Sequence, residues 1–434
     1  MDIPYIKRTL ANGLDVIVHE DRSLPMVAVN IWYHVGSKNE RPGRTGFAHL
    51  FEHLMFEGSE HHTTSYFGPL QQAGALLNGS TNSDRTNYWE VVPTGALELA
   101  LFLESDRMGH LLPALTEEKF QNQRDVVLNE RRQNYENRPY GLAGLALSTR
   151  LYHPNHPYHW PTIGWPDDLN AATLDDVRAF FRTYYHPSNA SLVLAGDVEA
   201  EQAFTLAEKY FGGLAPGPRP GPVEAEVEVT APRRDLLEDR IELPRIYMAW
   251  HSPRAFAADD AELDLAGDVI GHGKTSRLYR ALVFEKRIAT DVSAYQYSRE
   301  LGGMFQVAAT AVPGVALGEL ERVILDTVQE VAQQGPDAGE VERAVISTDA
   351  QFVYRLQTVG GFGGKSDQLN FYNVYCGDPG FFARDRARYD AATPASTASA
   401  VQRWLTGAPR VTLSVVPRDR RDLAAPDSSE VSVV

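Results

Sequence analysis

The sequence predicts an α+β protein built from two homologous αβ domains, each an antiparallel sheet flanked by helices. A chain of 434 residues is longer than one hydrophobic core usually organises. Strand-like and helix-like segments follow a similar order in the two halves. Between them lies APGPRPGP, the densest run of Pro and Gly, which can extend neither a helix nor a central strand. The expected divisions are residues 1–214, a linker at 215–235 and residues 236–434.

The first half alternates between strand and helix periodicity. KRTLANGLDVIVHED has alternating apolar positions broken by the turn signal Asn12-Gly13, and VAVNIWYHVGS follows as an apolar strand. TGFAHLFEHLMFEGS has apolar residues at helical spacing and ends at Gly58. The remaining expected elements are the strand TNYWEVVP, the helix GALELALFLESDRMGHLL, a helix over 116–134, a loop over 154–166, the helix LDDVRAFFRTYY, the strand ASLVLAGDV and the helix EQAFTLAEKYFGGL.

The second half repeats this plan in outline. RIYMAWHSP is typical of a strand, and AELDLAGDVIG stands as a helix where the first half has TGFAHLFEHLMFEGS. The later expected elements are the helix TSRLYRALVFEK, a strand near Ala294, the strand GGMFQVAATAV, the helices ALGELERVILDTVQEVAQQG and GEVERAVISTDAQFVYRL, and the strand RVTLSVVP. We therefore interpret the fold as duplicated.

Composition excludes several classes of protein. The proportions of apolar (43%), aromatic (10%) and charged (23%) residues are those of a globular protein. A net charge of -16 argues against nucleic acid as a partner, because phosphate binding needs a basic surface. No apolar run reaches about 18 residues, so no membrane span is expected. The N-terminus lacks a basic start and apolar h-region, which favours a cytoplasmic protein, or a periplasmic one if a leader was removed. The single cysteine, Cys376, allows no intrachain disulfide.

The string HLFEH, residues 49–53, carries the chemistry. On a helix each residue turns by about 100°, so His49 and His53 lie one turn apart on the same face. Two imidazoles at this spacing can bind one Zn²⁺ at about 2.0–2.1 Å. Glu52 projects from the same face, beside the metal but not bound to it. Such a carboxylate can take a proton from water whose pKa zinc has lowered toward about 7. H-x-x-E-H is the inverse of the H-E-x-x-H zinc-peptidase motif.

A catalytic zinc needs a third protein ligand. Glu130 follows apolar residues on a long expected helix that could face the first. Periodicity alone leaves Glu117, Glu118 and Glu136 as rivals.

At this point a resemblance becomes specific. GFAHLFEHLMFEGS, followed by the glutamate in VVLNERRQNYENRPYG, is similar to the M16 family of inverse-motif zinc peptidases, the relatives of pitrilysin, insulin-degrading enzyme and mitochondrial processing peptidase. The likeness runs nearly end to end and is strongest to the short bacterial two-domain branch, M16B. Other similar segments are LNGSTNSDRTNYWEVVP, HPYHWPTIGWPDDLNAATLDDVRAFFRTYYHPSNASLVLAGDV, SRLYRALV and LNFYNVYCGDPG.

The resemblance implies a fold and a site. The fold would be the duplicated LuxS/MPP-like metallohydrolase fold, with a metal site in the N-terminal domain alone and one Zn²⁺ per chain. The third ligand would be Glu130, by its spacing from His53. Two such two-domain units close around a chamber in which unfolded peptides are cleaved. An edge strand near the metal pairs with the substrate backbone, and its matching residues are Asn78, Gly79 and Ser80; without the family, LNGST is typical of an ordinary turn.

Two departures from the family pattern change the expectation. Where the family has a supporting Glu, seven residues before the third ligand, this chain has Gln123, a neutral amide beside the ligands. Self-sufficient members also carry an Arg and, seven residues later, a Tyr that help bind substrate and polarise its carbonyl. Those positions are Val283 and Thr290 here, and nearby Arg280, Arg287 and Tyr295 have the wrong spacing. We therefore favour a heterodimer with a homologous subunit that supplies Arg and Tyr over a homodimer.

Other clusters are interpreted as structural. His61-His62, His153, His156 and His159 lie in loop-like sequence, and we expect them to be solvated or packed in loops. The Gly-rich VGGFGGKS lacks phosphate-loop spacing and is expected to be a flexible loop. The predicted function is metal-assisted peptide hydrolysis with Glu52 as the base. The alternative is a non-hydrolytic binding or scaffold subunit that keeps the fold.

Overall fold

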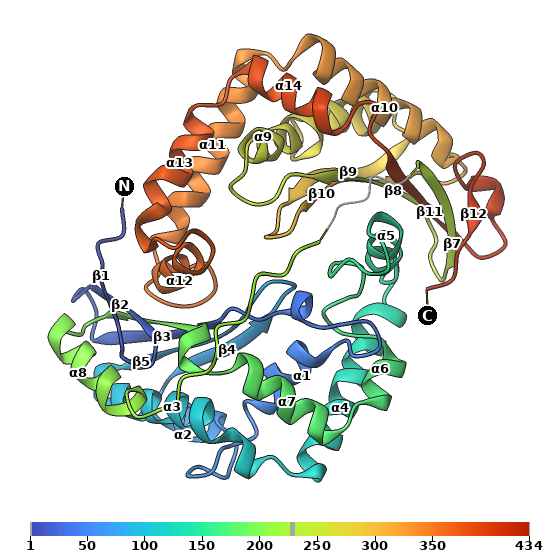
Figure 1. Ribbon diagram of the computed structural model, residues 1–434. Coiled ribbons are helices and arrows are strands. Elements are labelled where there is room, and N and C mark those ends of the chain that lie inside the picture. Colours follow the sequence, from blue (N-terminus) through green and yellow to red (C-terminus); the bar gives the residue numbers. More distant parts are fainter. Residues whose placement is uncertain (1, 226–230, 434) are drawn as a thin grey trace. The chain divides into compact units, whose positions relative to one another are not determined.

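The computed structural model describes residues 2–225 and 231–433 and contains two compact units (Figure 1). Unit 1 comprises residues 1–130, 161–223 and 351–384, and unit 2 comprises 131–160, 224–350 and 385–434. Part of the expected linker, residues 226–230, lies outside the described residues. The expected bounds of the homologous halves stay a prediction.

Unit 1 is built on a six-stranded sheet of order β1-β2-β6-β3-β5-β4. Its strands are β1 Ile6–Thr9, β2 Asp15–Glu20, β3 Met26–Tyr33, β4 Leu76–Thr81, β5 Thr86–Pro93 and β6 Ala190–Gly196. Its helices are α1 Phe47–Leu54, α2 Phe67–Gln72, α3 Leu97–Ala114, α4 Glu117–Arg131 up to residue 130, α6 Pro166–Ala171, α7 Leu174–Tyr184, α8 Ala200–Phe211 and α12 Lys365–Cys376.

Unit 2 is built on a second six-stranded sheet, of order β12-β7-β11-β8-β10-β9. Its strands are β7 Arg233–Asp239, β8 Arg245–Ser252, β9 Ala289–Tyr297, β10 Gly303–Ala311, β11 Arg410–Pro417 and β12 Ser429–Glu430. Its helices include α5 Ala143–Leu151, α9 Asp260–Gly271, α10 Leu317–Gln334 and α14 Pro394–Trp404, and α11 Ala338–Arg355 and α13 Phe382–Asp390 cross the unit boundary. The expected helix TSRLYRALVFEK is largely a π-helical stretch, Tyr279–Glu285.

The prediction of two αβ halves of one plan is confirmed by the topology. Strands β2, β6, β3, β5 and β4 lie side by side in the same order as β7, β11, β8, β10 and β9, their counterparts along the chain. The sheets were expected to be antiparallel but are mixed, since β6 pairs with β2 and β11 with β7 in parallel. The other pairs within these five-strand sets are antiparallel. The expected equivalence of AELDLAGDVIG also holds, because α9 follows β8 and packs on β9 as α1 follows β3 and packs on β4.

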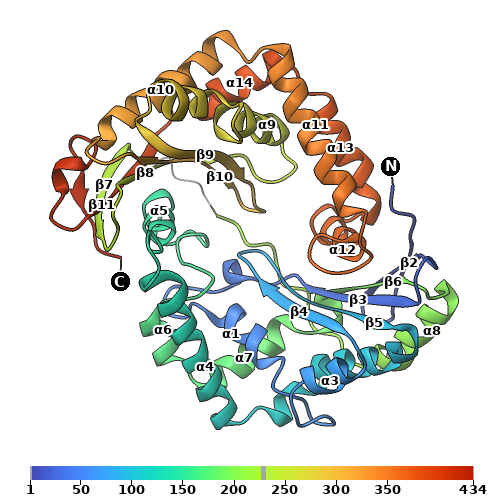
Figure 2. The same ribbon diagram turned by 180° about the vertical axis from the view of Figure 1, so that it is seen from behind.

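Helices pack on both faces of each sheet. On one face of each sheet, the helix comes from the half of the sequence that does not supply the strands. In unit 1, α1, α3 and α8 pack on one face, and α12 packs on β3 and β6 (Figure 1). In unit 2, α9 and α10 lie on one face and α5 packs on β11 and β8, the counterparts of β6 and β3 (Figure 2). Helices α5 and α12 are therefore exchanged reciprocally between the halves.

Polar side chains fix α12 on the unit 1 sheet. Asp367 is buried and accepts hydrogen bonds from Trp32 Nε1 at 2.9 Å, Asn87 Nδ2 at 3.2 Å and Asn30 Nδ2 at 3.4 Å. Asn370 Nδ2 donates to the Asn30 carbonyl at 2.9 Å. These residues of β3 and β5 are polar because they face this helix. Their neighbours on β3 face the opposite way into an apolar core.

None of the helices in the described ranges, 2–225 and 231–433, is both long and apolar enough to cross a membrane.

Candidate functional site

Helix α1 presents its polar residues on the side away from the core. Phe47, Ala48, Leu50, Phe51 and Leu54 are buried, whereas His49, Glu52 and His53 are only partly buried. The helix begins after Gly46, whose φ of 87° lies in the left-handed region. A Cβ at Gly46 would stand 2.9 Å from Leu169 Cδ2 and 3.0 Å from Gly164 Cα, so both backbone and space require glycine.

A buried carboxyl group satisfies the first turn of α1. Glu40 Oε2 accepts from the Gly46 backbone N–H at 2.9 Å, and Oε1 accepts from Ala48 N–H at 2.8 Å. The first N–H groups of a helix lack partners within it, so Glu40 stabilises the end of α1 that precedes His49. Burial raises the pKa of Glu40 to about 8, against the lowering effect of these backbone hydrogen bonds.

The structure brings together the three residues expected to bind metal. Glu130 Oε2, on α4, lies 3.6 Å from His49 Nε2 and 3.4 Å from His53 Nε2. The two imidazole rings meet edge to face, with centroids 4.9 Å apart. Their side chains are 12% and 23% exposed and that of Glu130 is 34% exposed, which leaves one side of the cluster open to solvent.

These donor atoms fit a zinc ion. Tetrahedral bonds of about 2.0–2.2 Å place neighbouring donor atoms roughly 3.3–3.6 Å apart, which is the spacing from the Glu130 oxygen to each nitrogen. Burial lowers the pKa of His49 to about 4, helped by His53 and opposed by Glu130, so its imidazole is neutral at neutral pH. Two imidazoles and a carboxylate are a typical donor set for catalytic zinc, with a fourth position left open.

Glu52 extends from the same helix toward the edge strand. Burial raises its pKa above the usual value, while a hydrogen bond with the Thr81 side chain and the charges of His53 and Arg85 lower it. Thr81 ends β4, so Glu52 lies between the expected metal ligands and that strand. Sequence reasoning missed Thr81, because the pairing of β4 with α1 depends on contacts remote in sequence.

The residues Asn78, Gly79 and Ser80 lie on β4, the outermost strand of its sheet. Among the described residues, β4 pairs with β5 alone, and it packs on α1. A Cβ on Gly79 would stand 3.1 Å from Tyr88 and 3.2 Å from Phe56, so glycine lets the strand lie close over the segment that follows α1. Ser80 donates to Asn87 Oδ1 at 2.6 Å and receives a hydrogen bond from Arg85.

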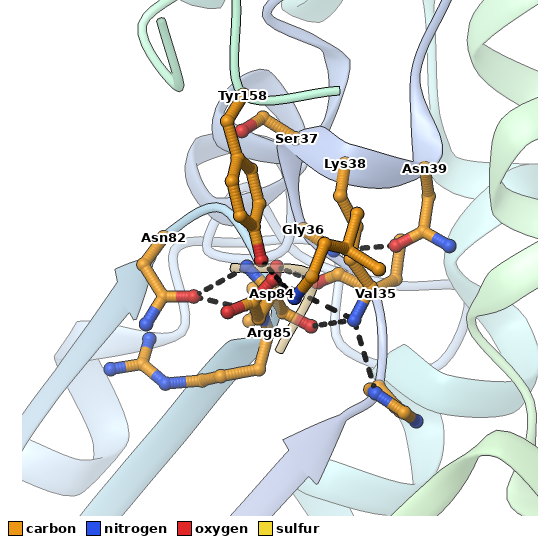
Figure 3. Close-up of polar contacts among 12 residues, drawn as sticks. Val35, Gly36, Ser37, Lys38, Asn39, Asn82, Asp84, Arg85 and Tyr158 are labelled. Carbon is orange, nitrogen blue, oxygen red and sulfur yellow. Dashed lines mark hydrogen bonds and ion pairs between the residues drawn. The ribbon is translucent and has the colours of Figure 1, made fainter. Parts of the chain in front are cut away.

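A polar cluster anchors the turn that joins β4 to β5 (Figure 3). The backbone N–H groups of Ser37 and Lys38 donate to the carbonyls of Asn82 and Ser83 at 3.2 and 2.8 Å. The turn itself is closed by Asn82 Oδ1, which accepts from the backbone N–H groups of Asp84 and Arg85 at 2.7 and 2.9 Å.

A buried ion pair reinforces this anchor. Lys38 Nζ lies 3.8 Å from Asp84 Oδ1 and donates to the Asp84 carbonyl at 3.3 Å, and the two side chains are 3% and 6% exposed. His34 Nε2 stands 3.2 Å from the same ammonium group. A Cβ on Gly36 would stand 2.4 Å from Asn82 O, so only glycine allows this approach. The cluster fixes the end of β4 nearest Glu52.

Gln123, expected beside the ligands, donates to Glu57 Oε1 at 2.8 Å. Glu57 lies just beyond the end of α1, so this contact joins α4 to α1 next to the three donor residues. The supporting role of Gln123 stays a prediction.

Unit 2 shows where the expected Arg and Tyr positions lie. Val283 is in the π-helical stretch, and Thr290 on β9 donates to Asp291 Oδ2 at 3.1 Å and to the Thr310 carbonyl at 3.3 Å. The Thr290 hydroxyl is thus used by its own sheet. Of the nearby candidates, Arg280 stands 3.9 Å from Glu340, and Tyr295 receives a hydrogen bond from Gln306.

Comparisons with known proteins identify the family of this chain. Residues 15–155 match the family model described as Insulinase (Peptidase family M16), and residues 171–347 match Peptidase M16 inactive domain. The zinc protease PqqE of Helicobacter pylori is 30% identical over 362 residues, covering 82% of this chain and 81% of that protein. The uncharacterized zinc protease YmxG of Bacillus subtilis is 24% identical over 370 residues, covering 84% and 88%.

Solved structures give the same result. The crystal structure of a protease from Helicobacter pylori has a TM-score of 0.87 and 25% identity, covering 96% of this chain and all (100%) of that chain. A structure of a peptidase M16 inactive domain from Pseudomonas fluorescens, at 20% identity and a TM-score of 0.84, shares the fold over 95% of this chain and 98% of its own. With both halves matched and the inverse motif in place, the chain belongs to the M16 family of peptidases.

Proposed function

We propose that this chain is a zinc metalloendopeptidase that hydrolyses unfolded peptides. His49, His53 and Glu130 hold one zinc ion, and Glu52 is the general base. The observation that carries the proposal is the distance from Glu130 Oε2 to the two imidazole nitrogens, 3.6 and 3.4 Å, which suits a tetrahedral ion. The names of the relatives, zinc proteases, support the same metal.

Zinc, when bound, supplies a Lewis acid and lowers the pKa of water at its open position. Glu52 accepts a proton from the attacking water and returns it to the leaving amine. The Thr81 side chain, at the end of β4, favours the charged form of the Glu52 carboxyl group and so lowers its pKa. The substrate extends along β4, the edge strand that carries Asn78, Gly79 and Ser80, and main-chain pairing places its scissile bond beside Glu52.

Replacing the base tests this proposal. Glu52→Gln is expected to retain the zinc content of wild type and to lose about 10²–10⁴-fold in kcat, because the amide cannot take a proton. Zinc content by elemental analysis and hydrolysis of an unfolded peptide are measured on the same samples. Glu117→Gln, an exposed glutamate on α4, is the matched control and keeps both properties. A zinc-free wild-type chain, or unchanged hydrolysis by Glu52→Gln, contradicts the proposal.

We further propose that the working enzyme is a heterodimer that encloses a chamber. Val283 and Thr290 supply no cationic or phenolic donor for the substrate carbonyl, and the Thr290 hydroxyl is already engaged. A homologous subunit with Arg and Tyr at those positions would supply them. Loss of one such donor typically costs about 10²–10³-fold in kcat. Adding that subunit should raise the rate of peptide hydrolysis by a similar factor. Full activity of the isolated chain would refute the proposal that a second subunit supplies Arg and Tyr.

A non-hydrolytic binding subunit is the second candidate, favoured by the match of residues 171–347 to a family model named for an inactive domain. It predicts peptide binding without cleavage, both alone and with the homologous subunit. The Glu52→Gln comparison separates the two candidates.

A further inference from the structure

A second group of metal-ligating side chains lies in unit 1, outside the HLFEH site. Glu60, His61 and His110 each offer a ligand atom, and these atoms lie within 4.8 Å of one another. The imidazole rings of His61 and His110 meet edge to face with centroids 4.8 Å apart. His110 Nδ1 stands 3.1 Å from Glu60 Oε2. Two imidazoles and a carboxylate suit a divalent transition metal such as zinc better than magnesium or calcium.

A buried carboxylate orients one of these histidines. Asp106 on α3 is 4% exposed, and its Oδ1 lies 2.5 Å from His61 Nδ1. The hydrogen bond places the imidazole proton on Nδ1, so the Nε2 lone pair is available to a metal. In metal sites, a histidine that binds the ion through one ring nitrogen typically donates a hydrogen bond from the other nitrogen to a carboxylate. Asp106 Oδ2 also accepts from the His61 backbone N–H at 3.1 Å and from the Ser59 hydroxyl, which fixes the carboxylate itself.

Backbone geometry and one backbone hydrogen bond position Glu60 and His110. Helix α3 is interrupted at His110, with φ −131° and ψ 24°, just before Pro113, whose ring excludes a regular helical turn. The His110 carbonyl accepts a hydrogen bond from Glu60 N–H at 3.0 Å. Gly58, with φ of 90°, starts the turn that delivers Glu60 and His61, and a Cβ there would stand 2.6 Å from Thr64 O. The segment after α1 is therefore docked on the kink of α3.

From this geometry we propose that Glu60, His61 and His110 form a second site, for a divalent transition metal, that fastens the segment after α1 to helix α3. The side chains are 46%, 55% and 42% exposed, so the site exchanges metal with solvent and is weaker than a buried one. Its residues do not overlap with the HLFEH site, and the proposal stands independently of the proposed peptidase activity. His61 lies in a solvent-exposed loop, as expected from sequence.

Zinc stoichiometry of the full-length chain tests the second site. Wild type is expected to bind two zinc ions per chain at micromolar free zinc. His61→Ala and His110→Ala should each bind one ion and keep the wild-type rate of peptide hydrolysis. His62→Ala is the matched control, since His62 is adjacent but outside the cluster, and should bind two. Asp106→Asn should lower the affinity of the second site for zinc by about 10–100-fold.

Thermal unfolding in the presence of zinc separates the new site from the first. In a His49→Ala/His53→Ala background, zinc should still raise the Tm. The second site joins two segments that are adjacent only in the folded protein, so zinc binds the folded state in preference to the unfolded chain. Adding His110→Ala should remove this rise, and circular dichroism shows that each variant is folded. The proposal is overturned if zinc fails to raise the Tm in the His49→Ala/His53→Ala background, or if His61→Ala and His110→Ala bind as many zinc ions as wild type.

Discussion

Glu40 shows how one residue outside the motif can control it. Its two oxygens accept hydrogen bonds from Gly46 and Ala48 at the start of α1, immediately before His49. The side chain is largely buried, and this burial raises the pKa of the carboxyl group to about 8. The folded protein therefore binds a proton at Glu40 over a pH range in which the unfolded chain has lost it.

This property predicts a pH-dependent stability. The folded-state pKa is raised, so the contribution of Glu40 is complete below its ordinary pKa of about 4.5 and is lost as pH rises through about 8. The free energy of unfolding of wild type should fall relative to Glu40→Gln between about pH 5 and pH 9, by on the order of a few kcal/mol. Urea unfolding of both proteins at several pH values measures the difference. A pH-independent difference would show that Glu40 does not titrate.

The residues of the HLFEH motif could be predicted from sequence, whereas the residues that support them could not. His49, Glu52 and His53 could be placed on one face because helical periodicity is local. Glu130 lies on another helix, and periodicity left three rivals that only the family spacing removed. Glu40 and Thr81 could not be found, since their partners lie at the ends of other elements. The one local signal for Glu40 was its position shortly before Gly46, the residue after which helix α1 begins.

At the scale of elements, the turn from β4 to β5 depends on a buried charge pair. Lys38 and Asp84 lie 3.8 Å apart with little exposure to solvent, on two segments distant in sequence. Removing one partner of a buried pair leaves the other charge in a poorly solvated place. The turn they hold positions β4 over α1.

We therefore predict a stability loss and a kinetic effect for Lys38→Met. The free energy of unfolding should fall by about 3–5 kcal/mol, because Asp84 keeps its charge without this ammonium group. KM for peptides should rise if β4 binds the substrate. Urea unfolding and steady-state kinetics measure the two effects. The exposed Arg22→Met serves as the control, and equal stability of the two variants would contradict the role of the pair.

Most elements with strong periodicity were found from sequence, and for three of the missed ones the physical cause is clear. Strands β3, β5 and β6 and helices α1, α7 and α8 lie within or close to their expected ranges. Strand β4 was not separable from a turn, because LNGST gains its strand geometry from pairing with β5 and packing on α1. Helices α5 and α12 were not expected, since each packs on the sheet of the other half.

At the scale of the whole molecule, each unit is completed by a segment from the other half of the sequence. Asp367 on α12 accepts hydrogen bonds from Trp32, Asn30 and Asn87 on the unit 1 sheet. The two compact units are thus discontinuous in sequence, although the strand order of each sheet arises within one half.

The docking of α12 predicts the effect of losing Asp367. Asp367→Ala should lower the free energy of unfolding by about 1–3 kcal/mol, because the Trp32 indole N–H and two amides lose their buried acceptor. Near-ultraviolet circular dichroism should change at the tryptophan bands. Chemical denaturation of the full-length protein measures the loss, with the exposed Asp390→Ala as control. An unchanged midpoint would mean that apolar packing alone holds α12.

The exchanged helix also sets the order of events during synthesis. Residues 49–53 and 130 are made early, but α12, which closes the opposite face of their sheet, ends at Cys376. A nascent chain cannot complete unit 1 until most of the protein has left the ribosome. A product that terminates before residue 351 carries the whole HLFEH motif and Glu130 on a sheet with one bare face. Chains that end before residue 351 therefore lack the helix that covers β3 and β6 of this sheet.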